Sequence, residues 1–251
     1  MLRPDIKLRA FVLLLAGACT ALGALAAQQV PRNLAPVRFE VRGWPDAAVA
    51  AAGAALSALP FVLSDSVASP CPCDPGGLSG IDRGAVGPVA TEAARWSNIT
   101  LTATVGLAGA GLLLARRGEL REAAAEDIAV FGQALLVTNG LTQVLKTVVA
   151  RPRPYVYDAS PPGTVAREDV SSFPSGHTSN AFAAAAACWS IQQRRGVAGR
   201  HVPAIVALFA LATATAVLRV EAHKHFPTDV LAGAALGTAV GWTLPRLHAV
   251  H

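Results

Sequence analysis

The 251-residue chain is 53% hydrophobic and only 15% charged, and its mean hydropathy is +0.43. An average soluble domain carries about 25% charged residues, so this excess of apolar side chains must be buried in a large core or in lipid. The net charge of +5 comes largely from arginines in short clusters between apolar runs, a pattern that argues against a nucleic-acid-binding face and is typical of a membrane topology signal.

The N-terminal quarter of the chain contains one apolar run and one irregular stretch. Residues 1–27, with three basic side chains before the apolar run 10–27, read either as a signal peptide or as a first membrane anchor. Residues 28–97 are predicted to be an extracytoplasmic segment with a surface helix at 47–64. Cys71 and Cys73 within it suggest either a metal or redox role or, outside the cytoplasm, a local disulfide.

Five further apolar segments occupy the helical core predicted for residues 98–251, and each approaches the length that crosses about 30 Å of hydrocarbon. They lie at about 98–115, 126–149, 178–192, 202–218 and 228–245. Arginine clusters in the connections at 116–121 and 194–200 satisfy the positive-inside rule if six segments, 10–27 included, span the bilayer. The sequence therefore predicts an all-α, membrane-embedded bundle of about six spans in the inner (plasma) membrane, and a soluble helical bundle stays open as the alternative.

This topology brings three loops to the extracytoplasmic side, and chemically distinctive residues gather in two of them. Three blocks stand out: residues 146–154 (KTVVARPRP), 173–178 (FPSGHT) and 218–229 (LRVEAHKHFPTD). Single cations at membrane-helix ends are common because Lys and Arg side chains reach the interface. Two histidines and an aspartate at the same helix ends are not explained in that way.

The residue types in these blocks suit phosphoryl chemistry. A phosphoryl group needs several cationic donors around its oxygens, which Lys146, Arg153 and Arg219 would supply. Ser175 and Gly176 precede a helix whose N-terminus favours an anion, although a simple N-cap explains them equally well.

The spacing of His225 and Asp229 predicts an activated histidine. Pro227 between them marks a helix start, so the Asp229 carboxylate is expected to reach back to one imidazole nitrogen and leave the other nucleophilic. His177, from a different helix end, is then free to protonate the leaving oxygen as general acid.

The combined pattern of Lys-x6-Arg-Pro, Pro-Ser-Gly-His and Arg-x5-His-x3-Asp resembles the signature of the type 2 phosphatidic acid phosphatase superfamily, which includes bacterial class A acid phosphatases and vanadium-dependent haloperoxidases. The resemblance implies a metal-independent phosphatase without a cofactor. His225 would be the nucleophile, Asp229 its orienting partner and His177 the general acid. The phosphate would be held by Lys146, Arg153, Arg219, Ser175 and Gly176.

The chain departs from that signature at one position and adds two residues that the signature does not include. Leu218 stands where the family usually has Ser, which removes a hydrogen bond but no charge. Arg151 and His223 are off-pattern, and we assign both to the rim of the site.

The leading hypothesis is therefore a multi-pass lipid phosphate phosphatase with its site on the extracytoplasmic side. Its substrate would be a lipid phosphate or a polyprenyl diphosphate, and its other partner the bilayer. Three alternatives stay open: a secreted soluble acid phosphatase, a vanadium haloperoxidase, and a non-catalytic membrane protein.

Overall fold

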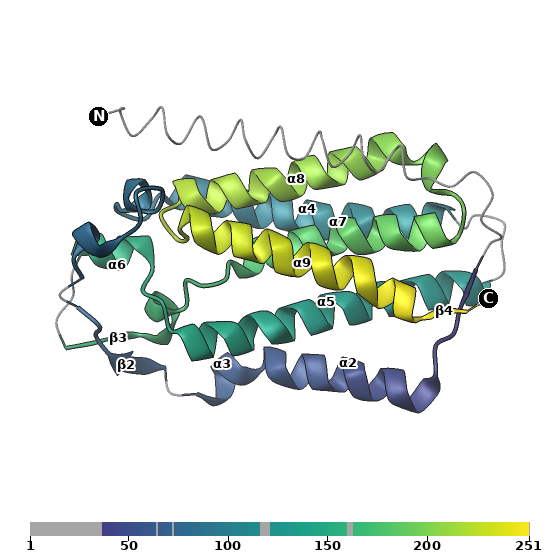
Figure 1. Ribbon diagram of the computed structural model, residues 1–251, viewed down its shortest axis with the longest axis horizontal. Helices are drawn as coiled ribbons and strands as arrows, with labels where there is room; N and C mark the ends of the chain where they lie inside the picture. Colours follow the sequence, from purple (N-terminus) through teal and green to yellow (C-terminus); the bar gives the residue numbers. More distant parts are fainter. Residues whose placement is uncertain (1–36, 64, 72, 116–120, 160–162, 251) are drawn as a thin grey trace.

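The computed structural model describes residues 37–63, 65–71, 73–115, 121–159 and 163–250, which form the predicted all-α bundle with short strand pairs at its two ends (Figure 1). Its α-helices are α2 (Gly43–Ser57), α3 (Leu59–Val62), α4 (Thr91–Ala115), α5 (Arg121–Val149), α6 (Pro154–Ala159), α7 (Gly176–Arg194), α8 (Val202–Glu221) and α9 (Pro227–Leu247). Antiparallel pairs join β1 (Arg38–Phe39) to β4 (Ala249–Val250) and β2 (Ser66–Ala68) to β3 (Thr164–Ala166). Short 3₁₀ helices are η1 (Pro75–Gly77), η2 (Arg83–Ala85), η3 (Arg167–Val170) and η4 (Ala198–Arg200).

Helix α7 is the centre of the bundle and packs against α4, α5, α8 and α9 (Figure 1). Residues 181–188 of α7 are all buried, and five consecutive alanines, 183–187, let the neighbouring helices approach closely. Phe182 of α7 meets Phe209 of α8 edge to face, with 6.1 Å between ring centroids. The apolar core therefore follows the length of α7.

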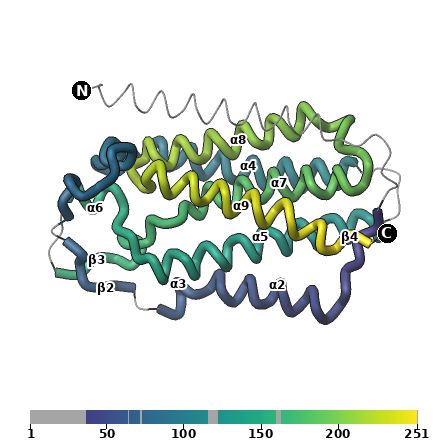
Figure 2. Tube along the Cα trace, in the orientation of Figure 1, coloured from purple at the N-terminus to yellow at the C-terminus, as the bar shows by residue number. Residues whose placement is uncertain are grey.

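The helices are arranged so that the three sequence blocks meet at one end of the bundle. Helices α4, α7 and α9 begin at the end where α5 and α8 finish (Figure 2). Helix α9 begins at Pro227, as predicted, and the Asp229 carboxylate accepts a hydrogen bond from the Phe226 N–H at 2.9 Å. The connections between these helices consequently lie next to one another.

Three stretches of the described residues are long and apolar enough to cross a bilayer: Thr91–Ala115, Glu122–Ala159 and Val202–Glu221. Helices α7 and α9 are not among them. Helix α7 is surrounded by its neighbours, so it has little need of an apolar surface facing lipid. The predicted first span at 10–27 lies outside the described residues, and the count of six spans is therefore only approximate.

Helix α2 covers much of the stretch at residues 47–64 where we expected a surface helix, and most of its residues are exposed. Helix α2 lies lengthwise along α5 (Figure 1), and at Gly53 the two backbones are so close that a Cβ would fall 2.8 Å from the Leu136 carbonyl carbon. Strand β1, just before α2, pairs with β4 at the bundle end opposite to β2 and β3. The described residues between 37 and 97 therefore do not all lie at one end of the bundle. The alanines of α2 are only weakly apolar, so the helix has a weak signal as a membrane span. Their small side chains also allow the close packing against α5.

Candidate active site

The predicted site residues all lie at the end of the bundle marked by β2, β3 and α6 (Figure 1). Lys146 is in the last turn of α5, and Arg219 is in the last turn of α8. Ser175 is the N-cap of α7, directly before Gly176 and His177. The remaining three residues stand in or beside short connections: Arg153 before α6, His225 before α9 and Asp229 in the first turn of α9.

Direct contacts join the three sequence blocks to one another. The Ser175 N–H donates to the Asp229 backbone carbonyl at 3.0 Å, which ties the second block to the third. The Lys146 Cε lies 3.6 Å from the position a Cβ would take on Gly176, which places the first block beside the second. Arg151 of the first block forms an ion pair with Asp229 of the third. The structure thus brings together segments that are up to 83 residues apart in the chain.

A cationic cluster, made of Lys146, Arg153 and Arg219, affects the pKa of both histidines. Burial, followed by the charges of these three cations and of Lys224, lowers the pKa of His177 to about 3. His225 is completely buried, and burial together with the same three cations holds its pKa well below the ordinary value. Both imidazoles are therefore neutral at pH 7 and close to a concentrated positive charge.

Two guanidinium donors in this cluster are buried and have no hydrogen-bond partner among the described residues: Arg153 Nη1 and Arg219 Nε. Other atoms of these side chains have partners, and Arg153 Nη2 pairs with the Glu168 carboxylate at 3.4 Å. Arg153 Nε donates to the Glu168 carbonyl at 2.8 Å, and Arg219 Nη1 lies 3.4 Å from Ser97 Oγ. A buried donor without an acceptor is costly, so donors in this state suit a site that binds an anion.

His225 is oriented mainly by a backbone carbonyl, a role that we had expected Asp229 to fill directly. His225 Nδ1 is 2.7 Å from the Ser172 carbonyl oxygen and 3.9 Å from the nearer Asp229 oxygen. Because a carbonyl oxygen only accepts, Nδ1 must carry the proton of the neutral ring. The other nitrogen, Nε2, is then unprotonated, as a nucleophile requires.

Three donors hold the Asp229 carboxylate. Its Oδ1 pairs with Arg151 Nη1 at 2.5 Å, and its Oδ2 accepts from Ser172 Oγ at 2.5 Å and from the Phe226 N–H at 2.9 Å. Ser172 thus touches both His225, through its carbonyl oxygen, and Asp229, through its hydroxyl. Arg151, which we assigned to the rim, has a partly exposed side chain that pairs with Asp229 and also with Asp82 at 2.9 Å.

His177 and His223 have different surroundings. His177 Nε2 contacts the Asn98 side-chain oxygen at 2.6 Å, so α4 contributes a polar partner that the sequence blocks do not reveal. His223 Nδ1 contacts the Ala85 carbonyl oxygen at 2.7 Å. His223 therefore fastens η2, which precedes α4, to the connection between α8 and α9.

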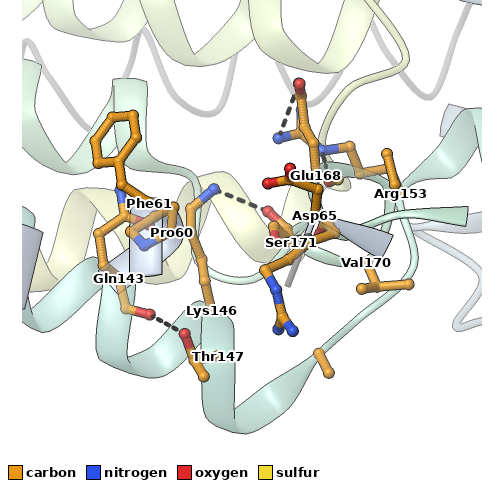
Figure 3. Close-up of a pocket in the computed structure, with 13 residues that line it drawn as sticks. Pro60, Phe61, Asp65, Gln143, Lys146, Thr147, Arg153, Glu168, Val170 and Ser171 are labelled. Atoms are coloured by element: carbon orange, nitrogen blue, oxygen red, sulfur yellow. Dashed lines mark hydrogen bonds and ion pairs between the residues drawn. The ribbon is translucent and has the colours of Figure 1, made fainter. Parts of the chain in front are cut away.

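A cavity of about 490 Å³ opens beside the cations (Figure 3). Lys146 and Arg153 line it, and Figure 3 shows the Lys146 ammonium group donating to the Ser171 carbonyl oxygen at 2.8 Å. Glu168 faces the same space, and the nearby Arg153 lowers the pKa of its carboxyl group. Pro60 and Phe61 of α3 form an apolar part of the wall. The cationic cluster therefore adjoins a space with both charged and apolar walls.

Cys71 and Cys73 are joined by a disulfide, which is one of the alternatives left open for this pair. In the described part of the chain no group of three or more His, Cys, Asp or Glu side chains is arranged to hold a metal ion.

Comparisons with known proteins agree with the signature. Residues 127–250 match the family model of the PAP2 superfamily, and all the predicted site residues fall within this range. No curated protein matches the chain. A solved structure described as the first transmembrane PAP2 type phosphatidylglycerolphosphate phosphatase from Bacillus subtilis is 20% identical, with 98% of this chain and 95% of that chain covered and a TM-score of 0.42. Residues 127–250 of the chain belong to the PAP2 superfamily.

Proposed function

We propose that the protein is a metal-independent phosphatase that hydrolyses the phosphomonoester or diphosphate of a lipid or polyprenyl substrate through a phosphohistidine. One observation carries the proposal: Lys146, Arg153 and Arg219 lie at the same end of the bundle as two histidines from different helix ends, and their charges lower the pKa of both. Three cations suit the equatorial oxygens of a phosphoryl group. Two histidines allow one to attack phosphorus while the other transfers a proton.

In the first half of the reaction, His225 Nε2 attacks phosphorus in line with the leaving oxygen. The P–N bond forms as the P–O bond to the leaving group breaks, and His177 delivers its proton to the departing oxygen. The negative charge of a bound phosphate opposes the cations that lower the pKa of His177 and so raises that pKa. His177 can then carry a second proton, as a general acid requires, when substrate is present. Asp229 and the Ser172 carbonyl stabilise the positive charge that develops on His225.

In the second half, a water molecule attacks the phosphorus of phosphohistidine. His177 accepts the water proton, the P–N bond breaks and inorganic phosphate leaves with the nucleophile restored. Ser175 and Gly176, at the N-terminus of α7, would add hydrogen bonds to the phosphoryl oxygens throughout.

The proposed substrate class rests on the position of the site. The cationic cluster lies at the end of helices apolar enough to cross a bilayer, and the adjoining cavity has an apolar wall at Pro60 and Phe61. An amphiphile can leave its chains in lipid while its phosphate enters the cluster. These features support a lipid or prenyl phosphate in preference to a small soluble ester.

The proposed orientation places the site outside the cytoplasm. The Cys71–Cys73 disulfide lies in the segment that approaches the site, and disulfides persist mainly in oxidising compartments. The end of the bundle away from the site carries Arg194, Arg200 and Arg246, in the last turns of α7, η4 and α9. The positive-inside rule places such basic residues in cytoplasmic loops.

A phosphate-release panel in EDTA tests this function. Purified protein in detergent is assayed with a lipid phosphate, a prenyl diphosphate and a soluble ester. We expect turnover of a lipid or prenyl substrate without added metal and its loss in His225→Ala. Absence of phosphate release from all three substrates would contradict the proposed function, and a clear preference for the soluble ester would contradict the substrate class.

A further inference from the structure

Asp82 is a buried carboxylate that lies outside the three sequence blocks and outside residues 127–250. It is only 3% exposed, and it is on the irregular segment that precedes α4. Its Oδ1 accepts from the Thr228 N–H at 3.1 Å, and its Oδ2 accepts from Thr228 Oγ1 at 2.8 Å and from Arg151 Nη2 at 2.9 Å. Asp82 therefore binds the first turn of α9, next to Asp229.

Arg151 connects Asp82 to Asp229. One arm of its guanidinium pairs with Asp82, while the other pairs with Asp229 Oδ1 and contacts Thr228 Oγ1 at 2.8 Å. The guanidinium carbon lies 4.2 Å from the centre of the Phe226 ring, which limits its movement. A planar fork can meet two carboxylates at once, whereas the point charge of a lysine cannot reproduce this geometry.

The contacts continue from Asp229 to the proposed nucleophile. Asp229 Oδ2 accepts from Ser172 Oγ, and the Ser172 carbonyl oxygen contacts His225 Nδ1. Two carboxylates and one guanidinium leave one net negative charge behind His225, on the side away from the attacking Nε2. This charge favours the positive imidazole that forms when His225 attacks phosphorus.

We infer that Asp82 and Arg151 are positioning residues, which hold Asp229 and the start of α9 so that His225 Nε2 is directed at phosphorus. This inference rests on the proposed phosphatase function. Neither side chain is assigned a contact with the phosphoryl group, because the cationic cluster that would hold it is made by Lys146, Arg153 and Arg219. A loss of positioning is therefore expected to slow the chemical step and to leave phosphate binding nearly unchanged.

The experiment compares Asp82→Asn with Asp74→Asn in the full-length protein in detergent. Asp82→Asn keeps the size and one acceptor oxygen but removes the charge, so kcat on the best substrate should fall about tenfold or more. KM and the inhibition constant of inorganic phosphate should stay within about twofold of the wild-type values, because the phosphate-binding cations are untouched. Asp74 is an exposed carboxylate of the same segment that caps η1, and its substitution should leave kcat unchanged.

Arg151→Lys provides a second test of the same contacts. It should also lower kcat with little effect on phosphate inhibition, and the double variant with Asp82→Asn should be no slower than the slower single variant, because both changes break one network. If Asp82→Asn does not fold, the result for Arg151→Lys decides.

Two results would overturn the inference alone: a wild-type kcat in both Asp82→Asn and Arg151→Lys, or a loss of phosphate inhibition as large as the loss of kcat. A wild-type protein that releases no phosphate would instead overturn the proposed function and this inference with it.

Discussion

At the scale of single residues, the two histidines of the site differ in what holds them. His225 is buried completely, and a backbone carbonyl fixes which nitrogen carries its proton. His177 is only partly buried at the N-terminus of α7 and contacts the side-chain oxygen of Asn98. A fixed ring suits a nucleophile that must always present the same nitrogen, and a ring beside the opening suits proton exchange with substrate and water.

The role of His177 as general acid predicts a dependence on the leaving group. In His177→Asn, kcat/KM on an alkyl phosphate should fall about 10²-fold or more, because the departing alkoxide is no longer protonated and kcat/KM does not include the later hydrolysis of phosphohistidine. The loss on p-nitrophenyl phosphate should be much smaller, because that leaving group departs readily as an anion. Steady-state assays of both esters measure the difference. Equal losses on the two substrates would contradict the assignment.

The sequence indicated candidate site residues, which the fold brings to one end of the bundle, but it did not reveal their partners. Lys146, His177 and His225 belong to a spaced pattern of residue types that phosphoryl chemistry requires, so they could be recognised without a structure. Ser172 acts partly through a backbone carbonyl, a group that every residue has, so no residue type signals it. Arg151 and Asp82 pair only because the fold joins positions 69 residues apart, which no local spacing reveals.

At the scale of helices, the interface of α7 and α9 depends on a row of glycines. Gly233, Gly237 and Gly241 recur every fourth residue of α9 and face α7. A Cβ on Gly237 would fall 2.0 Å from the Ser179 carbonyl oxygen, and one on Gly241 would fall 2.5 Å from that of Ala183. Such small residues let two helix backbones approach closely, as in many membrane interfaces. The packing also fixes Ser175 against Asp229 at the site.

This packing predicts that Gly237→Ala destabilises the protein even though alanine favours a helix. Forcing a methyl group against the α7 backbone should lower the free energy of unfolding by about 1–3 kcal/mol. Thermal unfolding in detergent measures the change. Gly106→Ala in α4 is the matched control: nothing lies within 4 Å of the added Cβ, so stability should be unchanged or rise by as much as about 1 kcal/mol. An equal or greater stability of Gly237→Ala would contradict the account.

Helix positions followed closely from the apolar runs, whereas the helix ends and the place of α2 did not. The run at 98–115 became α4, which begins at Thr91, and the run at 126–149 became α5, which begins at Arg121. Polar first turns extend a helix toward its N-terminus beyond the apolar run, so hydropathy alone places the start of each helix too late. The alignment of α2 with α5 depends on the close approach at Gly53, a tertiary contact that the alanine-rich sequence does not specify.

At the scale of the whole molecule, the two ends of the bundle have different chemistry. One end holds the cationic cluster, the Cys71–Cys73 disulfide and the β2–β3 pair. The other holds the β1–β4 pair and Arg195, which is buried against Asp127. If the bundle crosses a membrane, these two ends face different compartments.

The proposed orientation predicts that the site end is accessible from outside the cell. In a Cys71→Ser, Cys73→Ser background, a cysteine at exposed Gly80 should react with a membrane-impermeant maleimide in intact cells. A cysteine at exposed Arg200 should react only after the membrane is permeabilised. The unsubstituted background measures labelling of the remaining cysteines. The reverse pattern would place the site in the cytoplasm and contradict the proposed orientation.

The central claim, that phosphate passes through His225, is tested most directly by trapping the phosphoenzyme. Wild-type protein is mixed with a ³²P-labelled substrate that it turns over and is quenched within a turnover. His223→Asn is the control, because Asn tolerates the positive φ of 55° at that position and His223 is not assigned to catalysis. We predict a label that is labile in acid and stable in alkali on the wild type and on His223→Asn, and no label on His225→Ala. A label that persists in His225→Ala, or one that survives acid, would contradict the account.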